Sequence, residues 1–204
     1  MIPLDHKLHN FVPQHFGTLS DLLKEGRPGA CDALMIACSD HGTAPDNISF
    51  ARPGRFFILQ HLVSSIPSAD DYAADMTTAD IEYAFDSREI RHVIVCGHLQ
   101  CGIIRNFLEP GTADFGGLKE RFLDMALEVL DRDDISFSRE DRVELLIREH
   151  VLLQLEHLQT HHFIRERLET GDLQFHAWVV NDANARVFAF DARLAEFVPI
   201  EETI

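Results

Sequence analysis

Residues 33–42, ALMIACSDHG, pass from a continuous apolar run into a polar segment at a cysteine. A short apolar run without alternation is typical of a strand that is buried on both faces of a parallel sheet. A second run, RHVIVCGH at 91–98, has the same character and also ends in side chains that can bind a metal. Because ligands bind beyond the carboxyl ends of strands in such sheets, we expect the functional residues at the ends of these two runs.

The rest of the chain alternates between strand and helix patterns. RPGRFFILQ predicts a strand that opens at Pro53-Gly54, and the late strand QFHAWVV is followed by NDANA and RVFAF, which indicates a hairpin. Helical periodicity covers 18–26, 77–89, 117–130 and 138–168. Thr77 or Thr78 is the expected N-cap of the second helix, and Gly171 is the expected end of the fourth. This alternation predicts an α/β fold of three layers: a mostly parallel β-sheet with an antiparallel edge strand, flanked by helices.

The domain organisation follows from the length of the chain. With 204 residues the chain can bury a substantial core, and we expect one domain over 1–204. Residues 1–17 contain several His and Pro residues and show no clear period. We interpret them as an N-terminal arm that packs on the rest of the protein or on a partner subunit.

The charge of the chain limits its partners. The formal net charge of −16 argues against nucleic acid and anionic membranes, because both require clustered Lys and Arg. The N-terminus lacks the basic start and apolar stretch of a secretory signal, and every apolar run is far shorter than the roughly 20 residues of a spanning helix. We therefore expect a cytoplasmic protein, in which the four cysteines are thiols or metal ligands rather than disulfides.

Two of the cysteines have the character of packing residues. Cysteine is among the most buried residue types, so a single cysteine near a strand most often fills the core. Cys96 lies within its apolar run, and Cys31 lies in a loop without a potential ligand nearby in the sequence. We interpret both as structural.

The other two cysteines are accompanied by further potential ligands. Cys38 and Cys101 each follow an apolar run, and Cys101 forms a His-x-x-Cys pair with His98. Gly97 and Gly102 flank this pair and permit a tight turn that presents both side chains to one ion. Two thiolates and one imidazole form a ligand set that suits Zn²⁺, so the sequence predicts a zinc site.

Together with its other motifs, this ligand set resembles that of the β-class carbonic anhydrases, and the resemblance extends over nearly the whole chain. Several motifs occur in the family's order, and the late helix and the strand before Trp178 are also similar. The matching motifs are Cys38-Ser39-Asp40 for the start of Cys-x-Asp-x-Arg, with Pro45 after it, Pro53-Gly54, Ile81-Glu82-Tyr83-Ala84, and Gly97-His98-Leu99-Gln100-Cys101-Gly102.

The resemblance implies a zinc enzyme that interconverts CO2 and bicarbonate. By this resemblance Cys38, His98 and Cys101 are ligands of one zinc ion per chain. Asp40 is either the fourth ligand or the residue that orients the water on the zinc. The resemblance also implies a homodimer or homotetramer in which the N-terminal arm covers a neighbour.

One expected residue is missing. In the family an arginine two residues after the aspartate pairs with that carboxylate and holds it off the metal, and here this position is Gly42. A carboxylate without this partner should tend to coordinate the zinc and close the site. Arg27, Arg52 or Arg55 can replace the partner by a bidentate contact, and the alternative for each is a solvated surface arginine.

His41 is a candidate proton shuttle because it directly follows Asp40. The alternative is an exposed loop histidine without a role.

These features are compatible with three functions. The first is zinc-dependent hydration of CO2, slow or dependent on pH. The second is a zinc-binding homologue with impaired catalysis and a binding or regulatory role. The third is hydrolysis of a CO2-like molecule such as carbonyl sulfide or carbon disulfide. The intact ligand set favours the first.

Overall fold

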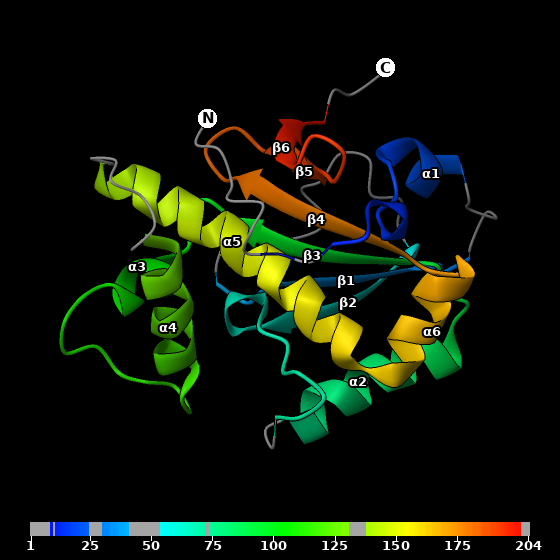
Figure 1. Cartoon of the computed structure of the whole chain (residues 1–204), viewed down its shortest axis with the longest axis horizontal. Helices are drawn as coiled ribbons and strands as arrows, with labels where there is room; N and C mark the ends of the chain where they lie inside the picture. The colour runs from blue at the N-terminus through cyan, green and yellow to red at the C-terminus, as the bar shows by residue number, and fades with distance from the viewer. Residues whose placement is uncertain are drawn as a thin grey trace.

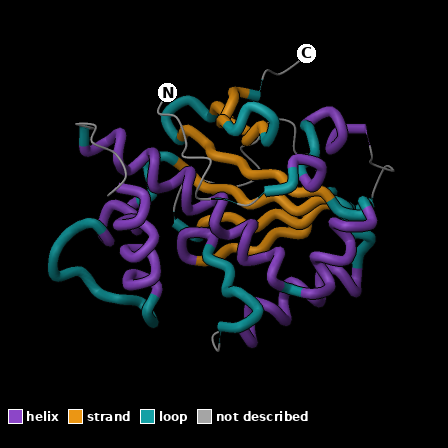
Figure 2. Tube along the Cα trace, in the orientation of Figure 1, coloured by secondary structure: helices purple, strands orange, loops and turns teal. Residues whose placement is uncertain are grey.

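The computed structural model describes residue 9 and residues 11–24, 30–40, 54–71, 74–130 and 138–200 (Figures 1 and 2). The end of the expected helix 18–26 and the motif residues Pro45 and Pro53 lie outside these residues.

A six-stranded mixed sheet forms the centre of the molecule, as Figure 2 shows in orange. Its strand order is β2-β1-β3-β4-β5-β6, in which the first four strands are parallel and the last two are antiparallel. The mostly parallel sheet with an antiparallel edge is confirmed, whereas the short outermost strand β6 was not expected. The strands are β1 (Ala33–Cys38), β2 (Phe56–His61), β3 (His92–His98), β4 (Gln174–Asn181), β5 (Arg186–Asp191) and β6 (Glu196–Pro199).

Six α-helices and two short 3-10 turns accompany the sheet in the described part of the chain. The expected helices 18–26 and 117–130 are confirmed as α1 and α4. The helix α3 was not expected, because six residues are too few to give a periodic pattern. The helices are α1 (Leu19–Lys24), α2 (Ala74–Ser87), α3 (Gly102–Phe107), α4 (Leu118–Leu130), α5 (Arg139–Thr160) and α6 (His162–Thr170), with 3-10 turns at Pro13–His15 and Leu62–Ser64.

Two helix boundaries differ from the expectation. The helix α2 begins at Ala74, so Thr77 and Thr78 lie inside it and neither is its cap. Alanine and methionine are good helix formers, and the helix therefore extends through Ala74 and Met76. The expected helix 138–168 is two helices, because His161 has extended backbone angles (φ −74°, ψ 124°) and its Nε2 hydrogen-bonds to the Pro67 carbonyl at 3.0 Å.

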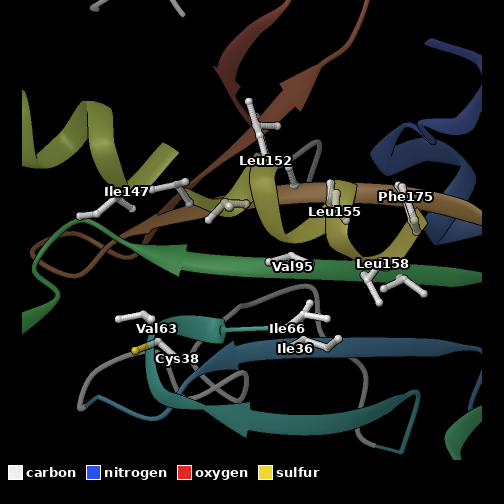
Figure 3. Packing of buried hydrophobic residues seen from close by; sticks show 14 of the residues in the cluster. Ile36, Cys38, Val63, Ile66, Val95, Ile147, Leu152, Leu155, Leu158 and Phe175 are labelled. Carbon is white, nitrogen blue, oxygen red and sulfur yellow. The ribbon is translucent and has the colours of Figure 1, made fainter. Parts of the chain in front are cut away.

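The sheet separates two apolar cores, so the three-layer expectation holds. Alternate residues of β1 point to opposite faces of the sheet. Leu34, Ile36 and Cys38 join the larger core beneath α5, whereas Ala33, Met35 and Ala37 join a smaller core with Leu22 of α1. Figure 3 shows the larger core, with side chains of α5 facing Val95 of β3 and Ile36 of β1.

The register of the parallel strands places their carboxyl ends at one edge. Ala37 of β1 pairs with Cys96 of β3, and His98 of β3 pairs with Val180 of β4. The predicted ligands Cys38 and His98 therefore lie on neighbouring strands at the same edge of the sheet. None of the described helices has the length and apolar character that a bilayer crossing requires.

The described part of the N-terminal arm packs on its own chain. His9 Nε2 lies 2.7 Å from a carboxylate oxygen of Glu149, and its Nδ1 lies 3.3 Å from Glu156, both on α5. The ring of Phe11 contacts those of Phe16 and Phe190. Because Glu149 is only 1% exposed, the charge of His9 compensates a buried carboxylate. Packing of the arm on a partner subunit stays a prediction.

We predict that this ion pair makes stability depend on pH. Burial lowers the pKa of His9, but hydrogen bonds to Glu149 and Glu156 outweigh burial and raise the pKa from 6.5 to about 9. Since the folded-state pKa exceeds the unfolded one, the stabilisation is complete below pH 6.5 and is lost as pH rises through 9. His9→Gln should lower the free energy of unfolding by roughly 2–3 kcal/mol at pH 6, and by much less at pH 10, in urea denaturation.

The matched control is His162→Gln, which alters an exposed histidine that faces Glu166 on α6. It should change stability by less than about 0.5 kcal/mol at either pH. An equal loss for the His9 variant at both pH values would contradict the assignment.

Candidate metal centre

Three buried ligand side chains converge at the carboxyl edge of the sheet. The ligand atoms of Cys38, His98 and Cys101 all lie within 4.8 Å of one another. Cys38 ends β1, His98 ends β3, and Cys101 is the N-cap of α3, directly after the turn at residues 99–100. Figure 3 shows the Cys38 sulfur at the end of β1, beside Val63. The structure thus brings together the three residues that the sequence predicts as zinc ligands.

The flanking glycines are needed for close approach. The expected tight turn is present at residues 99–100, and neither Gly97 nor Gly102 has the positive φ that would itself require glycine. A Cβ on Gly97 would lie 2.7 Å from a methyl carbon of Val151 on α5. A Cβ on Gly102 would lie 3.1 Å from Asp40 Oδ2. The two glycines let α5 and the Asp40 carboxylate approach the site.

The imidazole of His98 is held in one orientation. Its Nδ1 donates a hydrogen bond to Asp182 Oδ2 at 3.0 Å, and the same oxygen accepts the backbone N–H of Gln100 at 3.0 Å. The other ring nitrogen, Nε2, is buried and forms no hydrogen bond. A histidine that donates through one nitrogen to a carboxylate presents the lone pair of the other nitrogen to a metal. The orphaned Nε2 is therefore the ring nitrogen available to a metal.

Asp182 is a functional residue that the sequence reasoning missed. It directly follows β4, whose register pairs Val180 with His98. The apolar run QFHAWVV is followed by Asn-Asp, and polar residues at the end of this third parallel strand could have indicated a further residue of the metal centre.

The protonation of the site favours a bound cation. The sulfurs of Cys38 and Cys101 lie 4.0 Å apart, and their mutual hydrogen bond lowers the pKa of Cys38 to about 5 and raises that of Cys101. Burial opposes charge on His98, but the neighbouring Cys38 thiolate and Asp182 carboxylate outweigh it and raise the pKa of His98. The negative charge on Cys38 is thus stabilised by the thiol proton of Cys101 and by the imidazole of His98. A metal ion would take over the stabilising role of these two groups.

The distances and donor types fit zinc. Two sulfurs at 2.3 Å from a tetrahedral zinc lie about 3.8 Å apart, which is close to the observed 4.0 Å between Cys38 and Cys101. All three side chains are at most 1% exposed. A buried set of two thiolates and one imidazole suits Zn²⁺ better than Mg²⁺ or Ca²⁺, which prefer oxygen ligands.

Asp40 lies beside the centre without belonging to the group of three. Its Oδ2 accepts the backbone N–H of Gly102 at 2.6 Å, and its own N–H donates to Cys38 Sγ at 3.3 Å. The carboxylate thus has a donor at the start of α3. Coordination of zinc by Asp40, which the sequence analysis left open, stays a prediction.

Of the three arginines considered as partners of Asp40, one is placed elsewhere. Arg55 is buried and forms a bidentate ion pair with Asp32, with N···O distances of 2.8 and 3.2 Å. This pair lies at the amino ends of β1 and β2, about 20 Å from Asp40 along the strand. The expectations for Arg55, as a partner of Asp40 or as a solvated residue, are both wrong. Arg27, Arg52, Gly42 and the candidate proton shuttle His41 lie outside the described residues.

The remaining cysteines lie away from the centre. Cys96 points into the smaller core on the opposite face of the sheet, where burial raises the pKa of its thiol to about 12. Cys31 is half-buried in the loop before β1. Neither belongs to the group of three ligands, in agreement with their interpretation as structural residues.

A strained turn covers the centre. Val63 and Ser64 both have positive φ (52° and 57°), which is costly for a β-branched residue. His150 Nε2 donates to the Val63 carbonyl at 2.9 Å, and the Ser64 hydroxyl donates to the Cys96 carbonyl at 2.8 Å. The cavity between this turn and the ligands measures about 10 Å³, the lower limit for one water. The turn therefore keeps bulk water away from one side of the centre.

The comparisons with known proteins agree with this geometry. A family model described as carbonic anhydrase matches residues 33–187. The chain is 30% identical to a carbonic anhydrase of Synechocystis, with 97% of this chain and 73% of that protein covered. It is 28% identical to a carbonic anhydrase of Pseudomonas aeruginosa, with 83% of this chain and 78% of that protein covered.

A solved structure gives the same result for the fold. The structure of the β-carbonic anhydrase CcaA superposes with a TM-score of 0.73 at 30% identity. The match covers 89% of this chain and 90% of that chain. The similarity therefore extends over most of the sheet and its flanking helices.

We predict that Asp182 positions His98 for zinc binding. Asp182→Ala should leave the imidazole free to rotate and lower the affinity for zinc about 10- to 100-fold, measured by competition with a chelator. The control is Asp191→Ala, which removes a carboxylate that accepts the N–H groups of Arg193 and Leu194 in a remote turn. Equal zinc affinity of the two variants would show that Asp182 has no positioning role.

Proposed function

The chain belongs to the β-class carbonic anhydrase family, and on that premise we propose that it catalyses the reversible hydration of CO2 to bicarbonate with one zinc ion per chain. The observation that carries this proposal is the buried group of Cys38, His98 and Cys101, in which His98 Nε2 has no hydrogen-bond partner.

The three residues of this group would hold the zinc. Zinc bound by three protein ligands supplies Lewis acidity, which makes hydroxide available as a nucleophile near neutral pH. Cys38 and Cys101 would bind as thiolates, and Asp182 would keep His98 in the tautomer that offers Nε2. The backbone N–H of Asp40 donates to Cys38 Sγ and so reduces the negative charge on that ligand.

We infer that Asp40 orients the nucleophile and does not close the site. Its Oδ2 is engaged by the Gly102 N–H at 2.6 Å, a hydrogen bond that offsets part of the carboxylate charge. The Gly102 N–H thus provides part of the positive potential that the family's arginine, replaced here by Gly42, would provide to the Asp40 carboxylate. A carboxylate held in this way can accept a hydrogen bond from an attacking water and leave the fourth metal position open.

The competing function is a zinc-binding homologue without turnover. The feature that favours it is Gly42, which gives Asp40 no side-chain counter-charge from that position. In that case the zinc would have two thiolates, one imidazole and one carboxylate, as in a structural site. The hydrogen bond between Asp40 and Gly102 makes this arrangement the weaker proposal.

Assembly and location are further parts of the proposal. Ile58 on the edge strand β2, Leu62 directly after that strand and Tyr83 on α2 are 41%, 40% and 59% exposed. Exposed apolar side chains at the edge of a sheet suit contact with a second copy, so we propose a homodimer or homotetramer. A cytoplasmic location stays a prediction.

The test is the rate of CO2 hydration by the zinc-loaded protein. Cys101→Ser should lose zinc and lower kcat/KM at least about 100-fold, because it removes a ligand of the ion. The control Cys31→Ser alters a half-buried cysteine outside the ligand group and should keep both zinc and activity. Stopped-flow assays and metal analysis provide the two readouts.

The result that would refute the proposal is a zinc-replete wild type that does not accelerate CO2 hydration at any pH between mildly acidic and clearly alkaline. Hydrolysis of carbonyl sulfide or carbon disulfide under the same conditions would then favour the third function. Absence of all three activities would favour the binding homologue.

A further inference from the structure

Three arginines surround one cavity at the end of the sheet opposite the metal centre. The cavity measures about 640 Å³, within the range of small-molecule sites. Figure 1 shows α6 beside the carboxyl end of α2, and these two helices contribute Arg167 and Phe85 to the lining of the cavity. Arg88 and Arg91 come from the connection between α2 and β3, and Arg167 comes from the last turn of α6. The cavity is lined by Phe85, Arg88, Glu89, Ile90, Arg91, Arg167, Gly171, Asp172 and Gln174.

The three guanidinium groups have donors to spare. In the part of the chain that the structure describes, none of them forms an ion pair with a carboxylate. Arg88 donates to the Ser87 carbonyl at 2.7 Å and hydrogen-bonds to the Cys31 thiol, and Arg167 lies 5.0 Å from the centre of the Phe85 ring. A guanidinium has five N–H donors, so each group keeps donors for an acceptor in the cavity.

Stabilisation of the negative carboxyl ends of helices accounts for two of the three arginines at the cavity. Arg88 and Arg167 lie at the carboxyl ends of α2 and α6, where positive side chains stabilise the helix dipole. Arg91 belongs to no helix end, since it directly precedes β3 and its backbone N–H donates to the Asp32 carbonyl. Its side chain is exposed and lines the cavity, so it is accessible to a ligand there.

The overall charge of the chain does not prevent an anion from binding here. The net charge of −16 repels anions at long range, but salt screens exposed charges beyond about 8–10 Å. The residues that line the cavity include three arginines against the two carboxylates of Glu89 and Asp172. The local charge is thus positive in a strongly acidic protein.

We propose that this cavity binds a small phosphorylated molecule. Planar guanidinium groups match phosphate oxygens by paired hydrogen bonds, and three of them suit a ligand with at least two negative charges. The rim carboxylates of Glu89 and Asp172 can accept hydrogen bonds from hydroxyl groups of the ligand, and Asp172 already accepts one from Thr170. The cavity lies about 20 Å from the metal centre along β3, so it is separate from the proposed catalytic site.

The test is calorimetric titration of the zinc-loaded full chain with ADP and, separately, with inorganic phosphate. ADP should bind once per chain and more tightly than phosphate. Arg91→Gln and Arg167→Gln should each weaken ADP binding about tenfold, since each removes charge-assisted hydrogen bonds. The matched control is Arg165→Gln, on the same helix but outside the cavity, which should bind ADP as the wild type does.

Thermal denaturation of the variants separates a ligand site from a purely structural role. ADP should raise the melting temperature of the wild type and of the Arg165 variant, and should raise it less in the other two. The proposal is overturned if neither probe binds, or if all three variants bind ADP equally. It is also overturned if the Arg91 and Arg167 variants are only less stable and keep wild-type affinity.

Discussion

The parallel pairing of β1 with β3 and of β3 with β4 is the constraint on which the rest of the structure depends. Because these strands share a direction, Cys38, His98 and Asp182 arrive at one edge from positions that are far apart in the sequence. The tight turn after β3 then adds Cys101. Residues buried on both faces, such as Val95 in the larger core and Ile94 in the smaller core, fix the register, and a slip of one residue would turn every ligand to the wrong face.

Much of this arrangement could be predicted from the sequence. The continuous apolar runs at 33–38 and 92–98 identified the central strands, and the cysteine and histidine at their ends identified the metal ligands. Those signals are strong because buried parallel strands and zinc ligands permit few residue types. Short elements such as α3 and β6, and the break at His161, leave no periodic signal and were missed.

The hydrogen bonds that tune the site could not be predicted in the same way. Asp182 and Gly102 act on partners that lie 84 and 62 residues away in the sequence. The role of Gly102 rests on a backbone N–H, which every residue except proline has, so the residue type gives no signal. Arg55 was misplaced because its partner, Asp32, becomes its neighbour only through the pairing of β1 and β2.

The central claim is that Asp40 remains on the Gly102 N–H and leaves the fourth zinc position open. The most direct test is a crystal structure of the zinc-loaded protein at mildly alkaline pH, with the zinc–Asp40 oxygen distance as the measurement. We predict three protein ligands, an Asp40 carboxylate beyond bonding distance of the zinc, and an intact hydrogen bond of 2.6 Å from the Gly102 N–H to Asp40. An Asp40 oxygen at about 2.0–2.2 Å from the zinc, turned away from the Gly102 N–H, would contradict the account.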